Sequence, residues 1–417
     1  MELIPRYEYL EKIKKSLEKV PITVLIGARQ VGKTSLINSF DFKGSKVQVD
    51  GQLPEINEIF SKSDQAVEFL KIYLNDSING LLIIDEFQMI NNISPVLKIL
   101  VDNFPKLKIL CSGSSSLEIV QKVKESLAGR VRFININSLS FSESILFKYD
   151  DILFDEYKSK YTLNTGFFII NNKIKTLLDY HLIYGGMPRV WLENEPEEKR
   201  QILYDIYQTY LLRDIRNYVK NEDSVGFNRL LQILALQIGN LVNINELSRS
   251  TKLSYYKCEE YLYFLEQMFI IKMIKPSETN KRNALKKMKK VYFLDLGIRN
   301  ILIKDFNTLD IRLDSGALFE NFIFLEIIKN TKPYSDIEFF RTKDGAEIDF
   351  IINDMSNTYS IEAKYKYFKK PTYIKTLKNF NEIKNIKKSF LINLNLNTVI
   401  DNIHFLPVYL TEKIFNG

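Results

Sequence analysis

Gly27-Ala28-Arg29-Gln30-Val31-Gly32-Lys33-Thr34 fits the G-x-x-x-x-G-K-[ST] pattern of a phosphate-binding loop. In such a loop, backbone N–H groups and the N-terminus of a helix hold the phosphates of a nucleotide. The apolar run 22–26 before the loop predicts a buried strand, and residues 33–37 predict the first turn of a helix. A glycine-containing turn without a ligand is the alternative, but the complete motif between a strand and a helix favours nucleotide binding.

The motif residues have expected roles toward ATP and Mg²⁺. Lys33 is expected to reach the β- and γ-phosphates, and the Thr34 hydroxyl is expected to bind Mg²⁺. The residues expected to surround the nucleotide are Gly27, Ala28, Arg29, Gln30, Val31, Gly32, Lys33, Thr34 and Ser35. Downstream, the apolar run 81–84 is followed by Asp85 and Glu86, the pattern of a Walker B element. We expect Asp85 to hold Mg²⁺ and Glu86 to orient or deprotonate the attacking water.

Length and composition narrow the class of protein. The 417 residues are enough for two or three domains, because single cores stop growing at about 250–300 residues. Hydrophobic residues make up 45% and charged residues 26%, as in ordinary soluble proteins. The sequence has no apolar run of the ~18–20 residues that a membrane span needs and no signal peptide pattern, so we expect a cytoplasmic protein without membrane contact. Two cysteines and two histidines argue against a structural zinc site or a disulfide framework.

Strand and helix patterns alternate up to residue 138, as a parallel α/β sheet requires. The predicted strands cover 22–26, 46–50, 81–85, 107–112 and 132–136, with helices at 65–74 and 93–103 among them. Ser112 and Ser114, at the end of the fourth strand, are candidate sensors of the γ-phosphate. Capping of the next helix is the alternative role for these serines.

The middle of the chain is predicted to be mainly helical. Helices are expected over 139–191 and 199–219, with a polar break at 193–198 between them. Residues 242–268 predict a helix-turn-helix in which Ser254 caps the second helix. Predicted strands at 269–274 and 290–294 complete a fold that resembles a winged helix.

A basic segment lies between and within these two strands. Only Glu278 offsets its basic residues, which are Lys272, Lys275, Lys281, Arg282, Lys286, Lys287, Lys289 and Lys290. The segment is either a patch for nucleic acid or a solvated loop. Acids on the second helix, Glu259, Glu260 and Glu266, oppose contact with phosphates.

Several motifs together resemble those of a widespread archaeal and bacterial family that joins an AAA-type ATPase to a C-terminal domain similar to PD-(D/E)xK nucleases. They are Arg6-Tyr7-Glu8-Tyr9-Leu10, the phosphate loop, Asp85-Glu86-Phe87-Gln88, Ser112-Gly113-Ser114-Ser115, Leu127-Ala128-Gly129-Arg130, Leu139-Ser140-Phe141 and Gly185-Gly186-Met187-Pro188. The resemblance implies an α/β fold with an AAA-type core (1–138), a helical lid (139–195), a helical region with a winged helix (196–312) and a restriction-endonuclease-like domain (313–417).

The same resemblance implies further roles around the nucleotide. Arg130 would act as an arginine finger on a neighbouring subunit, which requires a homo-oligomer; a plain surface arginine is the alternative. Pro188 would contact the adenine base, and Arg189 is a candidate second sensor.

Asp349 and the run Glu362-Ala363-Lys364 lie on predicted neighbouring strands, the arrangement of a PD-(D/E)xK site. The two carboxylates would bind Mg²⁺, and Lys364 would activate water or stabilise charge on the phosphate. Glu320, on a helix predicted at 316–330, is a candidate further metal ligand. The alternative is a nuclease fold without activity that is used for binding.

These observations support two functional hypotheses. The first is a DNA-associated ATPase whose nucleotide state controls the nuclease-like domain. The second is a slow nucleotide switch that acts on protein partners, with the last domain as a silent scaffold.

Overall fold

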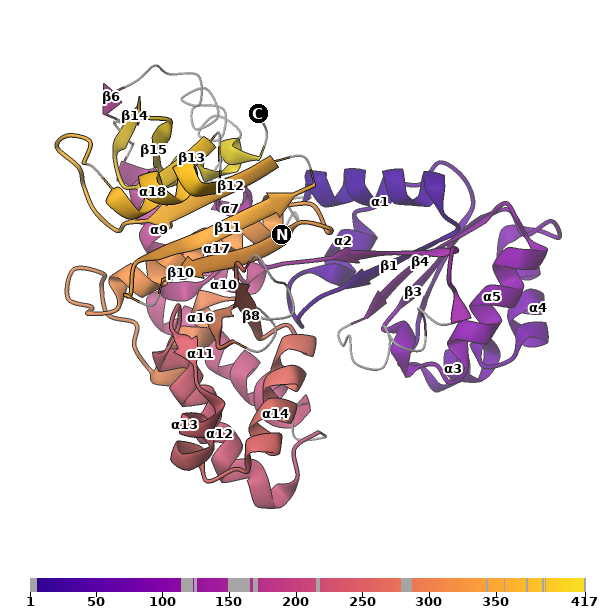
Figure 1. Cartoon of the computed structure of the whole chain (residues 1–417). Helices are drawn as coiled ribbons and strands as arrows, with labels where there is room; N and C mark the ends of the chain where they lie inside the picture. The colour runs from indigo at the N-terminus through magenta and orange to yellow at the C-terminus, as the bar shows by residue number, and fades with distance from the viewer. Residues whose placement is uncertain are drawn as a thin grey trace. The chain divides into compact units, whose positions relative to one another are not determined.

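The chain forms two compact units in a computed structural model (Figure 1). The structure describes residues 6–113, 123, 126–148, 166–167, 172–214, 218–278, 287–342, 344–355, 357–372, 374–384, 386 and 388–415. Unit 1 comprises Met1–Asn137 with Gln267–Phe269, and unit 2 comprises Ser138–Glu266 with Ile270–Gly417. The first division lies one residue from the predicted end of the ATPase core at residue 138.

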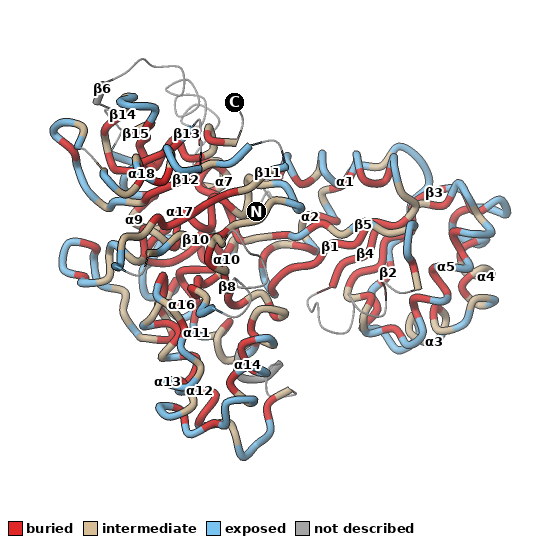
Figure 2. The backbone as a smooth tube through the Cα atoms, in the orientation of Figure 1, coloured by how far each residue is buried: buried red, intermediate tan, exposed pale blue. Residues whose placement is uncertain are grey.

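Unit 1 is built on a parallel sheet of five described strands in the order β2-β3-β4-β1-β5. The strands are β1 (Ile22–Ile26), β2 (Lys46–Asp50), β3 (Gly80–Asp85), β4 (Leu107–Gly113) and β5 (Val131–Asn135). Each lies within two residues of its predicted bounds, so the parallel α/β prediction is confirmed. Every residue of β1 and β3 is buried, whereas the edge strand β2 alternates buried and exposed residues (Figure 2). This difference arises because helices cover both faces of the central strands.

Helices pack against this sheet. They are α1 (Tyr7–Lys19), α2 (Lys33–Asn38), α3 (Pro54–Phe60), α4 (Ser63–Leu74) and α5 (Ile93–Asn103), with the 3₁₀ turn η1 (Phe87–Met89). One apolar core joins Leu82 and Ile84 of β3 with Leu70 of α4 and Leu97 of α5. Because β4 lies between β1 and β3, the carboxyl ends of these three strands meet at one edge, the usual place for a ligand in such sheets.

Unit 2 contains a sheet of ten described strands in the order β6-β14-β15-β13-β12-β11-β10-β8-β9-β7. The strands are β6 (Gly166–Phe167), β7 (Leu241–Val242), β8 (Ile271–Pro276), β9 (Lys289–Phe293), β10 (Asp336–Arg341), β11 (Glu347–Asp354), β12 (Asn357–Ala363), β13 (Lys388–Asn393), β14 (Leu396–Ile400) and β15 (Ile403–Pro407). Its α-helices are α7 (Phe141–Lys148), α9 (Asn172–Tyr184), α10 (Pro188–Leu192), α11 (Pro196–Ile206), α12 (Ser224–Leu236), α13 (Ile244–Thr251), α14 (Tyr255–Gln267), α16 (Leu296–Ile303), α17 (Ser315–Asn330) and α18 (Lys375–Lys384). The predicted long helix at 199–219 is instead α11 followed by the π-helical segment Tyr207–Asp214.

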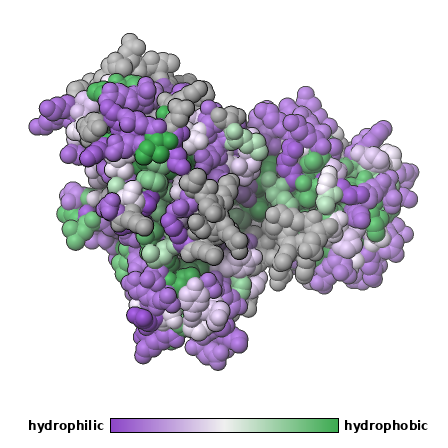
Figure 3. Space-filling view, in the orientation of Figure 1, coloured by the Kyte–Doolittle hydropathy of each residue, from purple (hydrophilic) through white to green (hydrophobic). Residues whose placement is uncertain are grey.

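The helix-turn-helix and its hairpin lie where they were predicted, but the hairpin continues into a larger sheet. Strands β8 and β9 pair antiparallel, and β7 pairs with β9. On its other edge β8 runs parallel to β10, with Lys275 opposite Glu338. The predicted divisions at 195/196 and 312/313 therefore both fall inside one compact unit. The face over α12 to α14 that is drawn in Figure 3 is mainly hydrophilic.

A β-bulge in β11 changes which side chains face α17. Between Ile348 and Ile351, β11 has one more residue than the facing segment of β10. Ile348 and Ile351 pack in one apolar cluster with Phe380 of α18. Phe350 instead stacks on Phe324 of α17, with 6.1 Å between the ring centroids. The bulge thus turns the residues between the two isoleucines toward α17.

Candidate nucleotide site and carboxylate cluster

The phosphate loop joins β1 to α2 in the predicted way. Gly32 caps α2 with φ +90°, a left-handed conformation that favours glycine. The Lys33 Nζ atom donates to the carbonyl oxygens of Gly27 at 3.0 Å and Ala28 at 2.8 Å. The loop therefore curls around the ammonium that is expected to meet the phosphates.

Burial lowers the pKa of Lys33 to about 8, although the nearby carboxylates of Glu86 and Asp85 act in the opposite direction. Lys33 is only 6% exposed. A buried cation without a full counter-charge is the feature that a triphosphate would complete.

Asp85, at the end of β3, is held by side chains from α2 and β4. Its Oδ2 accepts from the Thr34 hydroxyl at 2.7 Å, and its Oδ1 accepts from the Ser112 hydroxyl and from the Glu86 backbone N–H. Thr34 and Asp85 thus place two oxygen atoms together, and oxygen is the ligand that Mg²⁺ prefers. These residues fit the predicted magnesium site.

Glu86 follows directly in a left-handed backbone conformation, with φ +46°. The Gln88 side-chain amide donates to the Glu86 carboxylate. Gln88, the last residue of the motif Asp85-Glu86-Phe87-Gln88, therefore restrains the residue predicted to activate water.

Arg6, just before α1, supports the loop and was not predicted to do so. Its Nη1 donates to the carbonyl oxygens of Val31 at 3.2 Å and Asn137 at 2.9 Å. The sequence pointed to Arg6 only as part of the motif 6–10. No local pattern predicts which carbonyl groups an arginine side chain will contact.

Ser114 and Arg130 were also predicted to act at the nucleotide site. Ser114 lies outside the described residues. Arg130 forms a two-pronged ion pair with Asp102, with Nε–Oδ1 at 2.7 Å and Nη2–Oδ2 at 3.1 Å. Its role as a finger stays a prediction.

The motif Gly185-Gly186-Met187-Pro188 lies at a buried junction in unit 2. Gly185 has φ +75°, and a Cβ there would come within 2.2 Å of Asp295 Oδ1. The Gly186 N–H donates to Asp295 Oδ2 at 2.8 Å. Pro188 is half-buried and Arg189 exposed, so the structure supports a packing role for the glycines, and the predicted contacts of Pro188 and Arg189 with ATP stay predictions.

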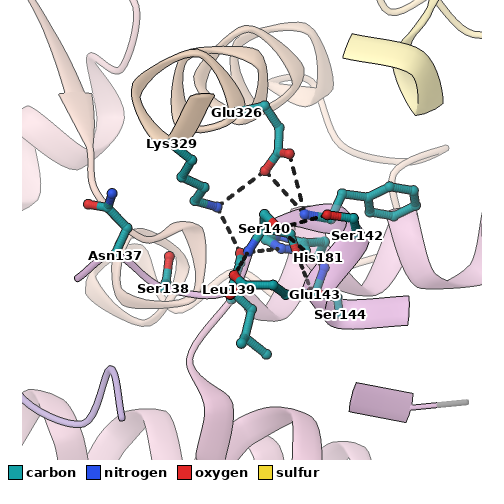
Figure 4. Close-up of polar contacts among 12 residues, drawn as sticks. Asn137, Ser138, Leu139, Ser140, Ser142, Glu143, Ser144, His181, Glu326 and Lys329 are labelled. Carbon is teal, nitrogen blue, oxygen red and sulfur yellow. Dashed lines mark hydrogen bonds and ion pairs between the residues drawn. The ribbon is translucent and has the colours of Figure 1, made fainter. Parts of the chain in front are cut away.

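The motif Leu139-Ser140-Phe141 also belongs to a buried polar cluster (Figure 4). The Leu139 carbonyl accepts from Lys329 Nζ at 2.7 Å and pairs with His181 Nε2 at 3.1 Å. The Glu326 carboxylate accepts from the Phe141 N–H and pairs with Lys329 at 3.2 Å. Burial lowers the pKa of His181 to about 3, so this histidine is neutral and structural.

Asp349, Glu362 and Lys364 come together on β11 and β12. Asp349 Oδ2 accepts from the Ala363 N–H at 2.8 Å, and Lys364 Nζ lies 2.6 Å from Glu362 Oε1. Burial raises the pKa of Asp349 well above its usual value, and the charges of Glu320 and Glu362 add to this effect. Burial also raises the pKa of Glu362, against the effect of Lys364. The buried carboxylates of Asp349 and Glu362 therefore hold a proton more readily than exposed carboxylates do.

Lys290 of β9 differs from the prediction for the basic segment, because it is neither in a solvated loop nor on an exposed patch. It is 1% exposed, and its Nζ lies 3.0 Å from Glu320 Oε1, in an ion pair with Glu347 and 4.0 Å from Asp349 Oδ1. Three other lysines of the segment also have acidic partners, namely Lys272 with Glu266, Lys275 with Glu338 and Lys287 with Glu278. Lys281, Arg282 and Lys286 lie outside the described residues.

The carboxylate cluster fits Mg²⁺ less well than the nucleotide site does. Across the described ranges, no group of three or more His, Cys, Asp or Glu side chains is arranged to hold a metal ion. The Lys290 ammonium stands among the acids instead. The metal-binding roles of Glu320, Asp349 and Glu362 stay predictions that this ammonium opposes.

No described helix has both the length and the apolar character that crossing a bilayer requires.

Comparisons with known proteins divide the chain into three matched segments. Residues 19–145 match an AAA domain, 175–309 match a domain of unknown function (DUF8612) and 315–410 match another domain of unknown function (DUF4143). An uncharacterized protein of Haemophilus influenzae is 25% identical, with 94% of this chain and 93% of that protein covered. One of Mycobacterium tuberculosis is 24% identical, with 87% and 74% covered.

Among solved structures, the Walker-type ATPase PABY2304 of Pyrococcus abyssi is 18% identical, with 72% of this chain and 96% of that chain covered and a TM-score of 0.49. Unit 1 combines five parallel strands, a phosphate loop at the end of β1 and the match to an AAA domain over 19–145. Unit 1 of this chain therefore has the fold of an AAA-type P-loop ATPase.

Proposed function

We propose that unit 1 binds ATP with Mg²⁺ and hydrolyses it. The observation that carries this proposal is the 2.7 Å hydrogen bond from Thr34 to Asp85, which brings the two predicted magnesium ligands together beside the buried Lys33. A divalent ion bound there would neutralise charge on the phosphates.

The residues of the chain supply the other parts of the reaction. Lys33 would exchange its two carbonyl partners for phosphate oxygens. Glu86, next to Asp85, would accept a proton from the attacking water or orient it. For this, Gln88 would have to release the Glu86 carboxylate.

Two variants test the proposal. Lys33→Ala removes the buried cation and should weaken ATP binding about 100-fold. Glu86→Gln should bind ATP normally but slow turnover at least ~100-fold. Fluorescent-nucleotide titration and phosphate release measure the two effects, with the exposed Lys43→Ala as control. Full turnover by the Glu86 variant would remove that residue as the water-activating group.

Two proposals concern what the ATPase cycle controls. A DNA-associated nuclease is supported by the convergence of Asp349, Glu362 and Lys364. A slow switch with a silent nuclease-like scaffold is supported by the Lys290 ammonium among the carboxylates and by the acidic partners of Lys272 and Lys275 in the basic segment. The contacts favour the switch.

ATP turnover and DNA affinity separate these alternatives. The switch predicts the same turnover with and without duplex DNA, and no DNA retention at low salt. Stimulation by DNA, or Mg²⁺-dependent cleavage that Lys364→Ala abolishes, would support the nuclease instead.

A further inference from the structure

Lys290 is the least expected member of the carboxylate cluster, because it comes from the hairpin strand β9 rather than from the nuclease-like strands. Its side chain is 2% exposed. The ammonium faces carboxylates from two elements, Glu320 of α17 and Glu347 and Asp349 of β11. Tyr292, two residues further along β9, donates its hydroxyl to Glu320 Oε1 at 2.5 Å.

An ammonium and a divalent metal are alternatives at this position. An ammonium has three donors, and here three carboxylates lie around it. Mg²⁺ needs oxygen ligands at about 2.0–2.1 Å and would be repelled by a cation that shares those ligands. The Lys290 ammonium is shielded from water, since its side chain is almost fully buried.

Other basic side chains also neutralise the carboxylates of this cluster. Lys364 pairs with Glu362 at 2.6 Å, and Arg341 pairs with Glu347 at 3.2 Å. Glu362 Oε2 is buried with no hydrogen-bond partner among the described residues, and this is the point that still needs a proton or a cation.

We propose that Lys290 is the resident cation of this cluster and that its ammonium takes the place a divalent metal would occupy between Glu320 and Asp349. The cluster then joins β9 to α17 and β11 as a structural centre of unit 2. This inference rests on the silent-scaffold form of the proposed function.

Mn²⁺ binding to the full chain tests the proposal. The Asp85→Asn variant provides the background, since it removes the predicted carboxylate ligand of the nucleotide site. Bound Mn²⁺ is counted by electron paramagnetic resonance without nucleotide. With Lys290 present, no equivalent of Mn²⁺ should bind at the cluster. Lys290→Ala should bind about one equivalent and show a melting temperature several degrees lower that Mn²⁺ raises again.

Lys275→Ala is the matched control, because this lysine lies on the adjacent strand and pairs with Glu338 outside the cluster. It should bind no Mn²⁺. One equivalent of Mn²⁺ bound in the presence of Lys290 and lost in Asp349→Asn would overturn the proposal. So would a folded Lys290→Ala that binds none.

If the Lys290 variants do not fold, the Mn²⁺ count on the chain that keeps Lys290 still tests the proposal. Failure of the ATPase proposal would appear separately, as absent ATP turnover in the chain with Asp85 intact, and would leave the Mn²⁺ counts unchanged.

Discussion

Lys33 and Lys290 are both buried, yet their surroundings act on them in opposite directions. At Lys33 burial dominates and lowers the pKa to about 8. At Lys290 burial also lowers the pKa, but the charges of Glu320, Asp349 and Glu347 outweigh it and raise the value to about 12. Lys33 therefore lacks a full counter-charge, which an anionic ligand could supply. The counter-charges of Lys290 are carboxylates of the protein itself.

The Lys33 environment predicts proton uptake on nucleotide binding. Because the folded pKa lies below the unfolded value of 10.5, the free energy of unfolding should rise with pH between about 8 and 10.5. Phosphate oxygens would raise the pKa again, so ATP binding at pH 8 should take up about half a proton, and affinity should fall above this pH.

Calorimetry in buffers of different ionisation enthalpy measures this uptake. Lys33→Arg stays charged throughout this range and should bind without it. A binding enthalpy for the unaltered chain that is the same in every buffer at pH 8 would contradict the prediction.

At the scale of elements, capping side chains mark where two helices of unit 2 begin. Ser254, predicted as an N-cap, accepts from the Lys257 N–H at 3.3 Å. Asn243 caps α13 by accepting from the N–H groups of Asn245 at 3.0 Å and Glu246 at 3.3 Å. Strands β14 and β15, which lie within 396–407, were not predicted, because short strands in a segment rich in Asn carry little periodic signal.

The cap of α13 can be tested by substitution. Asn243→Ala removes the acceptor for two backbone N–H groups and should lower the free energy of unfolding by about 1 kcal/mol. Asn243→Gly should cost only a few tenths of that value, because glycine is tolerated at this position. Urea unfolding followed by circular dichroism measures both, and equal losses in the two variants would argue against the cap.

At the scale of the whole molecule, the proposed arginine finger requires an oligomer. Arg130 is engaged by Asp102, but both groups are substantially exposed, so solvent screens the pair and release costs little.

Mixing two inactive variants tests this arrangement. Arg130→Ala keeps an intact nucleotide site, and Lys33→Ala keeps the arginine, so mixed oligomers should recover ATP turnover that neither variant shows alone. Arg132→Ala, an exposed neighbour, is the control and should keep full turnover. Arg130→Ala with normal turnover would leave Arg130 as a surface residue.

Local sequence patterns were enough to predict the fold of unit 1. The phosphate loop, the apolar strand that ends in Asp85-Glu86 and the alternating strands and helices are local patterns, and local patterns persist whatever the rest of the chain does. They predicted the parallel sheet and the meeting of Thr34 with Asp85.

The surroundings of Lys290, in contrast, depend on how distant segments of unit 2 pair. In the sequence it is one lysine in a basic segment, next to Lys289 and close to Lys287. The pairing of β8 with β10 carries its strand into the C-terminal sheet, and the bulge in β11 turns residues toward α17. Burial among Glu320, Glu347 and Asp349 then makes it a structural cation, because a charge removed from water is retained only where opposite charges surround it.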